Sequence, residues 1–168
     1  MRSFDELLDN NTRFATTDAR SGTPKIPFIP NKQIYLVTCI DPRVEPAALL
    51  GLDLGDAIVA RNVGGRITPA VLGDLAWISF LHEDKTPQAD WFELVIIHHT
   101  DCGSGLMADD DLRHRFAQRG FDEHQLRDTA VTHPAVTVAE DVGRVHDDRN
   151  VSAKIAVSGY TYDLDTGL

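Results

Sequence analysis

The fold of this chain is indicated first by the stretch IYLVTC at residues 34–39. Six β-prone residues follow one another without polar alternation, a pattern typical of a strand that is buried on both faces of a parallel sheet. The stretch ELVIIH at 93–98 has the same character, and AIVA at 57–60 is a shorter version of it. Towards the carboxyl end we expect a fourth strand over 154–158 and a separate terminal strand over 160–163.

Helical segments are expected between these strands. Thr68 with a proline after it is a typical helix start, because threonine caps the first N–H groups and proline fits the first turn. We expect this helix to run to about His82. A short helix around 45–50 and a mostly helical stretch over 109–149 follow other strands. Strands that alternate with helices predict the α/β fold class, with a mostly parallel central sheet flanked by helices.

The chain divides into an N-terminal arm, residues 1–33, and one α/β domain, residues 34–168. Residues 3–14 have the apolar spacing of a short helix, whereas glycine and prolines punctuate 15–33 and predict irregular structure. The arm has too few apolar residues to form a core of its own. We therefore expect it to pack on its own domain or on a second subunit.

The composition excludes several classes of partner. With 16 basic against 26 acidic residues, the chain of 168 residues carries a net charge of −10. No basic face is visible for nucleic acid, and no Lys/Arg cluster for a membrane surface. No apolar stretch approaches the length of a transmembrane helix, and the N-terminus lacks the basic-then-apolar layout of a secretory signal. We therefore expect a cytoplasmic location.

Three residues that commonly bind metals follow two of the predicted strands. Cys39 ends the first strand, and His99 and Cys102 are expected just past the end of the third. Because ligand sites in open parallel sheets lie beyond the carboxyl ends of the strands, the three side chains can converge. Two thiolates and one imidazole suit zinc, and three protein ligands leave a fourth position for water, as in catalytic sites. Three alternatives remain open: buried packing cysteines, a Cys39–Cys102 disulfide and a structural zinc with a further ligand.

The two neighbouring histidines are expected to have different roles. Successive side chains of a strand face opposite sides, so at most one of His98 and His99 easily faces the site. His99 has the better spacing to Cys102, and we expect His98 to be packed or hydrogen-bonded in the core.

Asp41 and Arg43 follow Cys39 directly and are expected to interact. An arginine beside an aspartate keeps the carboxylate charged and lowers its pKa. Near a zinc ion, that carboxylate could orient a bound water or could itself occupy the open position. The alternative is an ordinary surface ion pair of little energetic value.

Together these residues resemble the β-class carbonic anhydrases. The segment CIDPR at 39–43 resembles the Cys-x-Asp-x-Arg motif of that family, and HTDCG at 99–103 resembles its His-x-x-Cys-Gly motif. The segment RNVGG at 61–65 is similar to the Arg-Asn-Ala-Gly segment between them, with valine for the usual alanine. The resemblance covers about residues 31–168 and is strongest to the compact branch first known from archaea.

The resemblance implies an enzyme with one zinc ion per subunit. The implied ligands are Cys39, His99 and Cys102, with Asp41 and Arg43 as a catalytic dyad. A zinc-bound hydroxide would add to carbon dioxide to give bicarbonate, the reaction of a carbonate dehydratase lyase. The family also implies an obligate homodimer or a larger homo-oligomer, with the cleft near the subunit interface and the N-terminal arm embracing the partner.

Backbone N–H groups near Gly64 and Gly103 are expected to bind the oxygens of the substrate, by analogy with an oxyanion site. The plant-type branch carries a substrate-binding glutamine nine positions before its first cysteine ligand, and Pro30 stands there in this chain. The compact branch also lacks that glutamine, so the departure leaves the zinc chemistry intact but opens the question of the substrate.

Two other functions stay open. Relatives in the same branch hydrolyse carbonyl sulfide or carbon disulfide with the same zinc site and release hydrogen sulfide. Ser104 and Gly105 stand where a larger apolar residue is common, which could widen the pocket for a sulfur atom. The third possibility is a non-catalytic zinc-binding or thiol redox protein.

Overall fold

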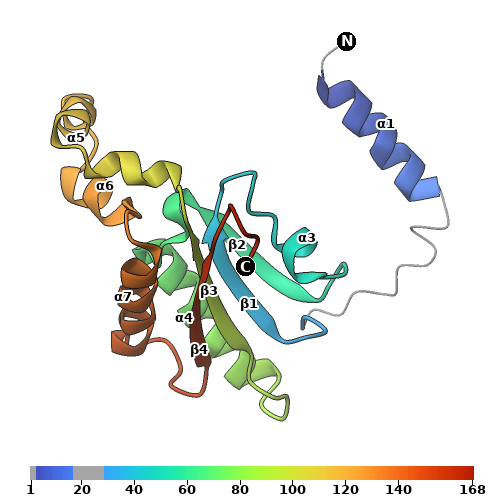
Figure 1. Cartoon of the computed structure of the whole chain (residues 1–168). Coiled ribbons are helices and arrows are strands. Elements are labelled where there is room, and N and C mark those ends of the chain that lie inside the picture. Colours follow the sequence, from blue (N-terminus) through green and yellow to red (C-terminus); the bar gives the residue numbers. More distant parts are fainter. Residues whose placement is uncertain (1–2, 17–28) are drawn as a thin grey trace.

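Four parallel strands form the central sheet, in the order β2-β1-β3-β4 (Figure 1). The strands are β1 (Ile34–Cys39), β2 (Ala57–Asn62), β3 (Glu93–His99) and β4 (Ala156–Tyr162). The computed structural model describes residues 3–16 and 29–168 of the chain. Every strand pair among them is parallel, which confirms the predicted α/β fold class.

Several helices lie before, between and beside the strands (Figure 1). They are α1 (Ser3–Thr16), α3 (Pro46–Leu50), α4 (Pro69–Lys85), α5 (Asp110–Ala117), α6 (Glu123–Thr129) and α7 (Pro134–Asp147), with short 3-10 helices η1 (Val63–Gly65) and η2 (Gly103–Ala108). Of these, α4 and α7 pack on the sheet. Thr68 caps α4 as predicted, and its hydroxyl accepts a hydrogen bond from the N–H of Val71 at 3.4 Å. The helix continues past the predicted end near His82 to Lys85, because no glycine or proline interrupts it there.

The main apolar core lies between the sheet and the helices α4 and α7. Leu94 and Ile96 of β3 are fully buried in this cluster, together with Leu75 of α4 and Val138 of α7. Because side chains alternate along a strand, the residue that continues the Leu94 and Ile96 face is His98. A histidine therefore ends an otherwise apolar row.

The prediction of two separate strands near the carboxyl end was wrong, because Ala156–Tyr162 is one continuous strand. Gly159 lies inside this strand. A Cβ atom at this position would be 2.9 Å from Cγ2 of Val138 and 3.0 Å from Cγ2 of Val142. The glycine therefore permits close packing of α7 on β4 and does not end the strand.

Helix α1 is amphipathic and exposes its apolar side chains. Phe4, Leu7 and Leu8 are 63%, 56% and 51% exposed, and Figure 1 shows the helix away from the sheet. The helix extends slightly beyond the predicted 3–14, whereas most of the predicted irregular segment 15–33 lies outside the described residues. No helix in the described part of the chain is long and apolar enough to cross a membrane.

The strand order places a crevice between β1 and β3. The chain passes from β1 to β2 on one side, and β3 then pairs with β1 on the other side. Connections that leave in opposite directions open a crevice at the carboxyl ends of the two strands, where ligands bind in open α/β sheets. Cys39 ends β1 and His99 ends β3, so both residues reach this crevice.

Candidate metal centre

Cys39, His99 and Cys102 come together at the crevice between β1 and β3. One ligand atom from each residue lies within 4.8 Å of the other two. All three residues are buried, with 4%, 0% and 9% of their surface exposed. The convergence predicted from the strand ends is therefore present. The expected position of His99 was slightly wrong, because it is the last residue of β3 and pairs with Tyr162 of β4.

The spacing of the sulfur atoms fits a metal centre. The Sγ atoms of Cys39 and Cys102 are 3.8 Å apart, and both cysteines are free. A disulfide would bring them to about 2.05 Å. Two thiolates on a tetrahedral zinc, each with a bond of about 2.3 Å, have their sulfur atoms about 3.8 Å apart. The observed separation therefore agrees with the zinc arrangement and not with the disulfide.

His99 is oriented to offer its Nε2 atom. Its Nδ1 lies 2.8 Å from the carbonyl oxygen of Thr100, so Nδ1 carries the hydrogen and donates. Burial acts to lower the pKa of His99, but the Cys39 sulfur and the Thr100 carbonyl outweigh it, and the pKa is raised. Nε2 is nevertheless buried without a hydrogen bond of normal geometry. A buried polar atom without a partner needs an explanation, and a metal ion beside the two sulfurs supplies one.

The two sulfur atoms hold one proton between them at neutral pH. The hydrogen bond with Cys102 raises the pKa of Cys39 to about 11. The same hydrogen bond, with help from Ser104, lowers the pKa of Cys102 to about 6. Because metal ions bind thiolates, one thiol proton must leave when a divalent ion binds here.

Asp41 is held rigidly beside this centre by Arg43. Its Oδ1 accepts hydrogen bonds from the backbone N–H and the Nε of Arg43 at 2.9 and 3.0 Å, and its Oδ2 accepts one from Nη2 at 2.8 Å. Arg43 lowers the pKa of Asp41 to about 2, so the carboxylate is ionised at neutral pH. Arg43 is fixed in turn by Asp101, which accepts from it through Oδ2 at 2.7 Å and through its backbone carbonyl at 2.9 Å. Arg43 therefore bonds to Asp41 of the 39–43 segment and to Asp101 of the 99–103 segment at the same time, and so links the two segments.

Arg61 fixes the backbone on which Cys39 and Asp41 lie. Its guanidinium donates to the carbonyl oxygens of Cys39, Asp41 and Val44 at 3.0, 2.8 and 2.7 Å. Neither this role nor that of Asp101 was assigned from the sequence. Their positions could have indicated these roles, because Arg61 lies at the end of β2 and Asp101 lies between His99 and Cys102 in the sequence.

Glycines bring the η1 turn against the ligands. Gly65 has φ +67°, and a Cβ atom there would be 2.8 Å from the backbone nitrogen of Cys39. Gly64 has φ +80°, and a Cβ atom there would be 2.6 Å from the carbonyl oxygen of Thr129. In contrast, a Cβ atom at Gly103 would meet nothing within 4 Å. Gly64 thus has a packing role, whereas the space next to Gly103 is open.

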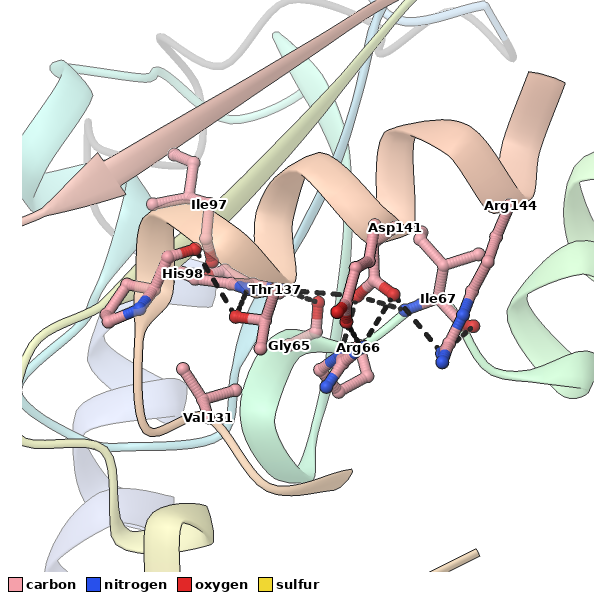
Figure 2. A network of polar contacts seen from close by, with 12 residues as sticks. Gly65, Arg66, Ile67, Ile97, His98, Val131, Thr137, Asp141 and Arg144 are labelled. Atoms are coloured by element: carbon pink, nitrogen blue, oxygen red, sulfur yellow. Dashed lines mark hydrogen bonds and ion pairs between the residues drawn. The ribbon is translucent and has the colours of Figure 1, made fainter. Parts of the chain in front are cut away.

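A second polar cluster lies on the other side of β3 (Figure 2). His98 contacts Thr137 through Nδ1 at 2.8 Å, and its Nε2 lies 3.2 Å from both the Gly65 carbonyl and Oδ2 of Asp141. Asp141 is fully buried and also accepts from Arg66 Nε at 2.8 Å. His98 is therefore a hydrogen-bonded core histidine, as predicted.

The fold and this site define a class: an α/β protein with a Cys-His-Cys cluster able to hold a metal ion at the switch point of a parallel sheet. The family model for carbonic anhydrase matches residues 34–133, which include all three residues of the cluster. The chain belongs to the β-carbonic anhydrase family.

Relatives and solved structures agree with this placement. Beta-carbonic anhydrase 1 of Mycobacterium tuberculosis is 29% identical over 171 residues, which cover 99% of this chain and 96% of the relative. The crystal structure of a carbonic anhydrase from Streptococcus mutans is similar with a TM-score of 0.77 at 30% identity, covering 100% of this chain and 96% of that one. A carbon disulfide hydrolase of Saccharolobus solfataricus is 29% identical over 100 residues, but these cover only 59% of this chain and 46% of the relative.

Proposed function

We propose that the protein hydrates carbon dioxide to bicarbonate with one zinc ion held by Cys39, His99 and Cys102. The observation that carries the proposal is the unpartnered, buried Nε2 of His99 beside two sulfurs at the spacing of zinc ligands. Zinc bound there supplies a nucleophile at neutral pH, because it lowers the pKa of a coordinated water from 15.7 to about 7.

The residues around the ligands orient the reactants. Asp41 is ionised and held in place by three hydrogen bonds from Arg43. As a carboxylate, it can accept a hydrogen bond from a bound hydroxyl group or water but cannot donate one. A fixed acceptor of this kind aligns the attacking oxygen towards the carbon of the substrate. The backbone N–H groups near Gly64 and Gly103 are proposed to bind the substrate oxygens, and the open space next to Gly103 supports this role.

The function is tested with the purified protein, loaded with zinc and given each substrate separately. We expect rapid proton and bicarbonate production from carbon dioxide and little hydrogen sulfide from carbonyl sulfide or carbon disulfide. Metal analysis of the same sample should give one zinc per chain. Rapid sulfide release with slow hydration of carbon dioxide would replace the proposal with the hydrolase function.

The hydrolase alternative is favoured by the carbon disulfide hydrolases among the relatives. Its other support from the sequence becomes weaker in the structure. Ser104 accepts a hydrogen bond from the Val131 N–H at 3.2 Å, and a Cβ atom at Gly105 would be 3.1 Å from the Val131 carbonyl. The small residues are thus needed for packing against Val131 and need not widen the pocket.

The Asp41→Ala variant tests the role of the carboxylate separately from that of the metal. Asp41 is not among the clustered ligands, so we expect the variant to keep its zinc. Its turnover should fall about 10²–10⁴-fold, the range for loss of a positioned acid–base group. Zinc content and the rate of carbon dioxide hydration are measured on one sample. Full turnover in the variant would remove Asp41 from the mechanism.

We further propose that the chain forms a homodimer or a larger homo-oligomer in the cytoplasm, and that the arm, residues 1–33, packs on the partner. The exposed apolar side of α1 is expected to be buried against a partner, and Trp77 and Phe80 of α4 are also exposed at 61% and 65%. The cytoplasmic location is supported separately by the two free cysteines, which fit a reducing compartment. The double variant Leu7→Asp with Leu8→Asp should dissociate the assembly in sedimentation experiments, whereas Asn10→Asp, outside the apolar stripe, should not. An unchanged mass in the double variant would exclude α1 from the interface.

A further inference from the structure

Ser104 lies directly against the sulfur of Cys102. Its Oγ is 3.2 Å from Sγ of Cys102, and the residue is only 6% exposed. The backbone N–H of Val131 donates to the same Oγ at 3.2 Å. A thiolate that binds a metal can only accept a hydrogen bond, so the hydroxyl hydrogen of Ser104 must point at the sulfur.

The hydroxyl has little freedom to turn elsewhere. A Cβ atom at Gly64 would be 3.0 Å from Oγ of Ser104, which shows how closely the η1 turn covers it. With Val131 on one side and Gly64 on the other, Ser104 holds a single orientation.

The two cysteines differ in this respect. Each sulfur receives a backbone N–H, from Asp41 at Cys39 and from Ser104 at Cys102. Among the described residues, only Cys102 also has a hydroxyl neighbour. Thr38, the residue before Cys39, donates its hydroxyl to the carbonyl of Ile97 at 2.9 Å and not to sulfur.

We propose that Ser104 is a positioning residue that tunes the donor strength of Cys102 towards the metal ion. This proposal rests on the metal centre described above. A hydrogen bond to a coordinating thiolate withdraws electron density from the sulfur, so the metal keeps more of its positive charge. A more positive metal is a stronger Lewis acid and activates water at a lower pH.

The test compares Ser104→Ala with Thr38→Val in the full chain loaded with cobalt(II), whose thiolate charge-transfer absorption reports on the sulfur. Both variants lose one buried hydroxyl next to a cysteine ligand, but only the first loses a hydrogen bond to sulfur. We expect the absorption of Ser104→Ala to move to longer wavelength and the midpoint of its activity–pH profile to rise, because the sulfur then gives more electron density to the metal. Thr38→Val should keep the wild-type absorption and midpoint.

An unmoved absorption in fully loaded Ser104→Ala would overturn the proposal. If Ser104→Ala does not hold cobalt, Ser104→Thr decides, because it keeps the hydroxyl: a wild-type absorption supports the proposal and a shifted one contradicts it. The outcome is separable from the proposed function. A wild-type protein that binds cobalt through its thiolates but does not hydrate carbon dioxide would refute the function and leave the role of Ser104 to be decided by the absorption.

Discussion

Consecutive residues of β3, His98 and His99, take part in two different polar clusters in the interior of the protein. His98 joins Arg66, Thr137 and Asp141 on the side of α7, whereas His99 joins the two cysteines beyond the strand end. Each histidine is 0% exposed. Burial and residue type therefore do not distinguish the structural cluster from the candidate metal centre.

The two clusters differ in how many of their buried polar atoms have a hydrogen-bond or ion-pair partner. Asp141 accepts hydrogen bonds from Ile67 and Arg66 and forms an ion pair with Arg144. His98 has a neighbour at each ring nitrogen, Thr137 at Nδ1 and Asp141 at Nε2 (Figure 2). In the other cluster, Nε2 of His99 has no hydrogen bond of normal geometry. Buried polar groups in folded proteins are almost always paired, so the unpaired atom marks the place that needs a ligand. Nε2 of His82 and Nε of Arg113 are also buried without a partner among the described residues, but only Nε2 of His99 lies beside two sulfur atoms.

The largest expected effect separates the two histidines with one substitution. His99→Ala removes a proposed metal ligand and should abolish zinc binding, which in structural zinc sites is worth about 10–16 kcal/mol. His98→Ala removes the same ring from an equally buried position, and should cost about 1–3 kcal/mol of stability while keeping the zinc. Zinc content is measured in both variants after gel filtration, and their stability is measured by thermal unfolding.

Two results would break this comparison. Zinc retained at full stoichiometry in His99→Ala would remove His99 from the ligand set. Zinc lost from a folded His98→Ala protein would show that the structural cluster is needed to shape the centre.

The sequence predicted which side chains come together better than it predicted what holds them in place. Cys39 and His99 could be found because both follow apolar strands, and parallel strands bring their carboxyl ends together. The separate fates of His98 and His99 followed from strand alternation. In contrast, the partners of His98 come from α7, about forty residues away. Local spacing carries no information about such contacts.

The errors have a common physical cause. Two strands were predicted over 154–158 and 160–163, but Gly159 between them lies inside one strand and accommodates the close approach of α7. A glycine that permits packing and a glycine that permits a turn look the same in a sequence. Asp101 and Arg61 were likewise visible, but the loops that they connect come together only in the folded chain.

The next effect in size concerns the structural cluster. Burial alone would raise the pKa of Asp141, but hydrogen bonds from His98, Arg66 and the Ile67 N–H outweigh it and lower the pKa from 3.8 to about 2. Asp141→Asn leaves Arg66 buried without its charged partner and should cost about 3–5 kcal/mol of unfolding free energy. Urea unfolding at neutral pH measures this loss. A loss below about 1 kcal/mol would show that the carboxylate does not hold the cluster.

The difference in stability between wild type and Asp141→Asn is expected to depend on pH. Because the folded pKa of Asp141 is below the unfolded value, its stabilisation is fully present above about pH 4 and is lost as the pH falls towards 2. The lower pKa of Asp141 in the folded protein, about 2 instead of 3.8, corresponds to about 2 kcal/mol. The difference in stability between wild type and Asp141→Asn should therefore be constant from pH 7 to 5 and shrink in more acidic solution. A difference that grows below pH 4 would contradict the assignment.

The smallest of these effects is expected at Gly65, the residue where the two clusters meet. Its carbonyl oxygen lies 3.2 Å from Nε2 of His98, and its Cα side faces the backbone of Cys39. Gly65→Ala would strain a residue at φ +67° and place a Cβ atom 2.8 Å from the Cys39 nitrogen, at a cost of about 1–3 kcal/mol. Since the displaced backbone carries a ligand, zinc affinity should also fall, by about 10-fold.

Gly51→Ala is the matched control, because Gly51 has φ +63° and a Cβ atom there would meet nothing within 4 Å. It should share the backbone strain and leave zinc affinity unchanged. Zinc affinity is measured for both variants by competition with a chelator, and stability by thermal unfolding. Equal zinc affinity in Gly65→Ala and Gly51→Ala would mean that zinc binding does not depend on the close packing of Gly65 against Cys39. A selective loss in Gly65→Ala would mean that the close packing of the η1 turn on the backbone of Cys39 holds the candidate metal centre in shape.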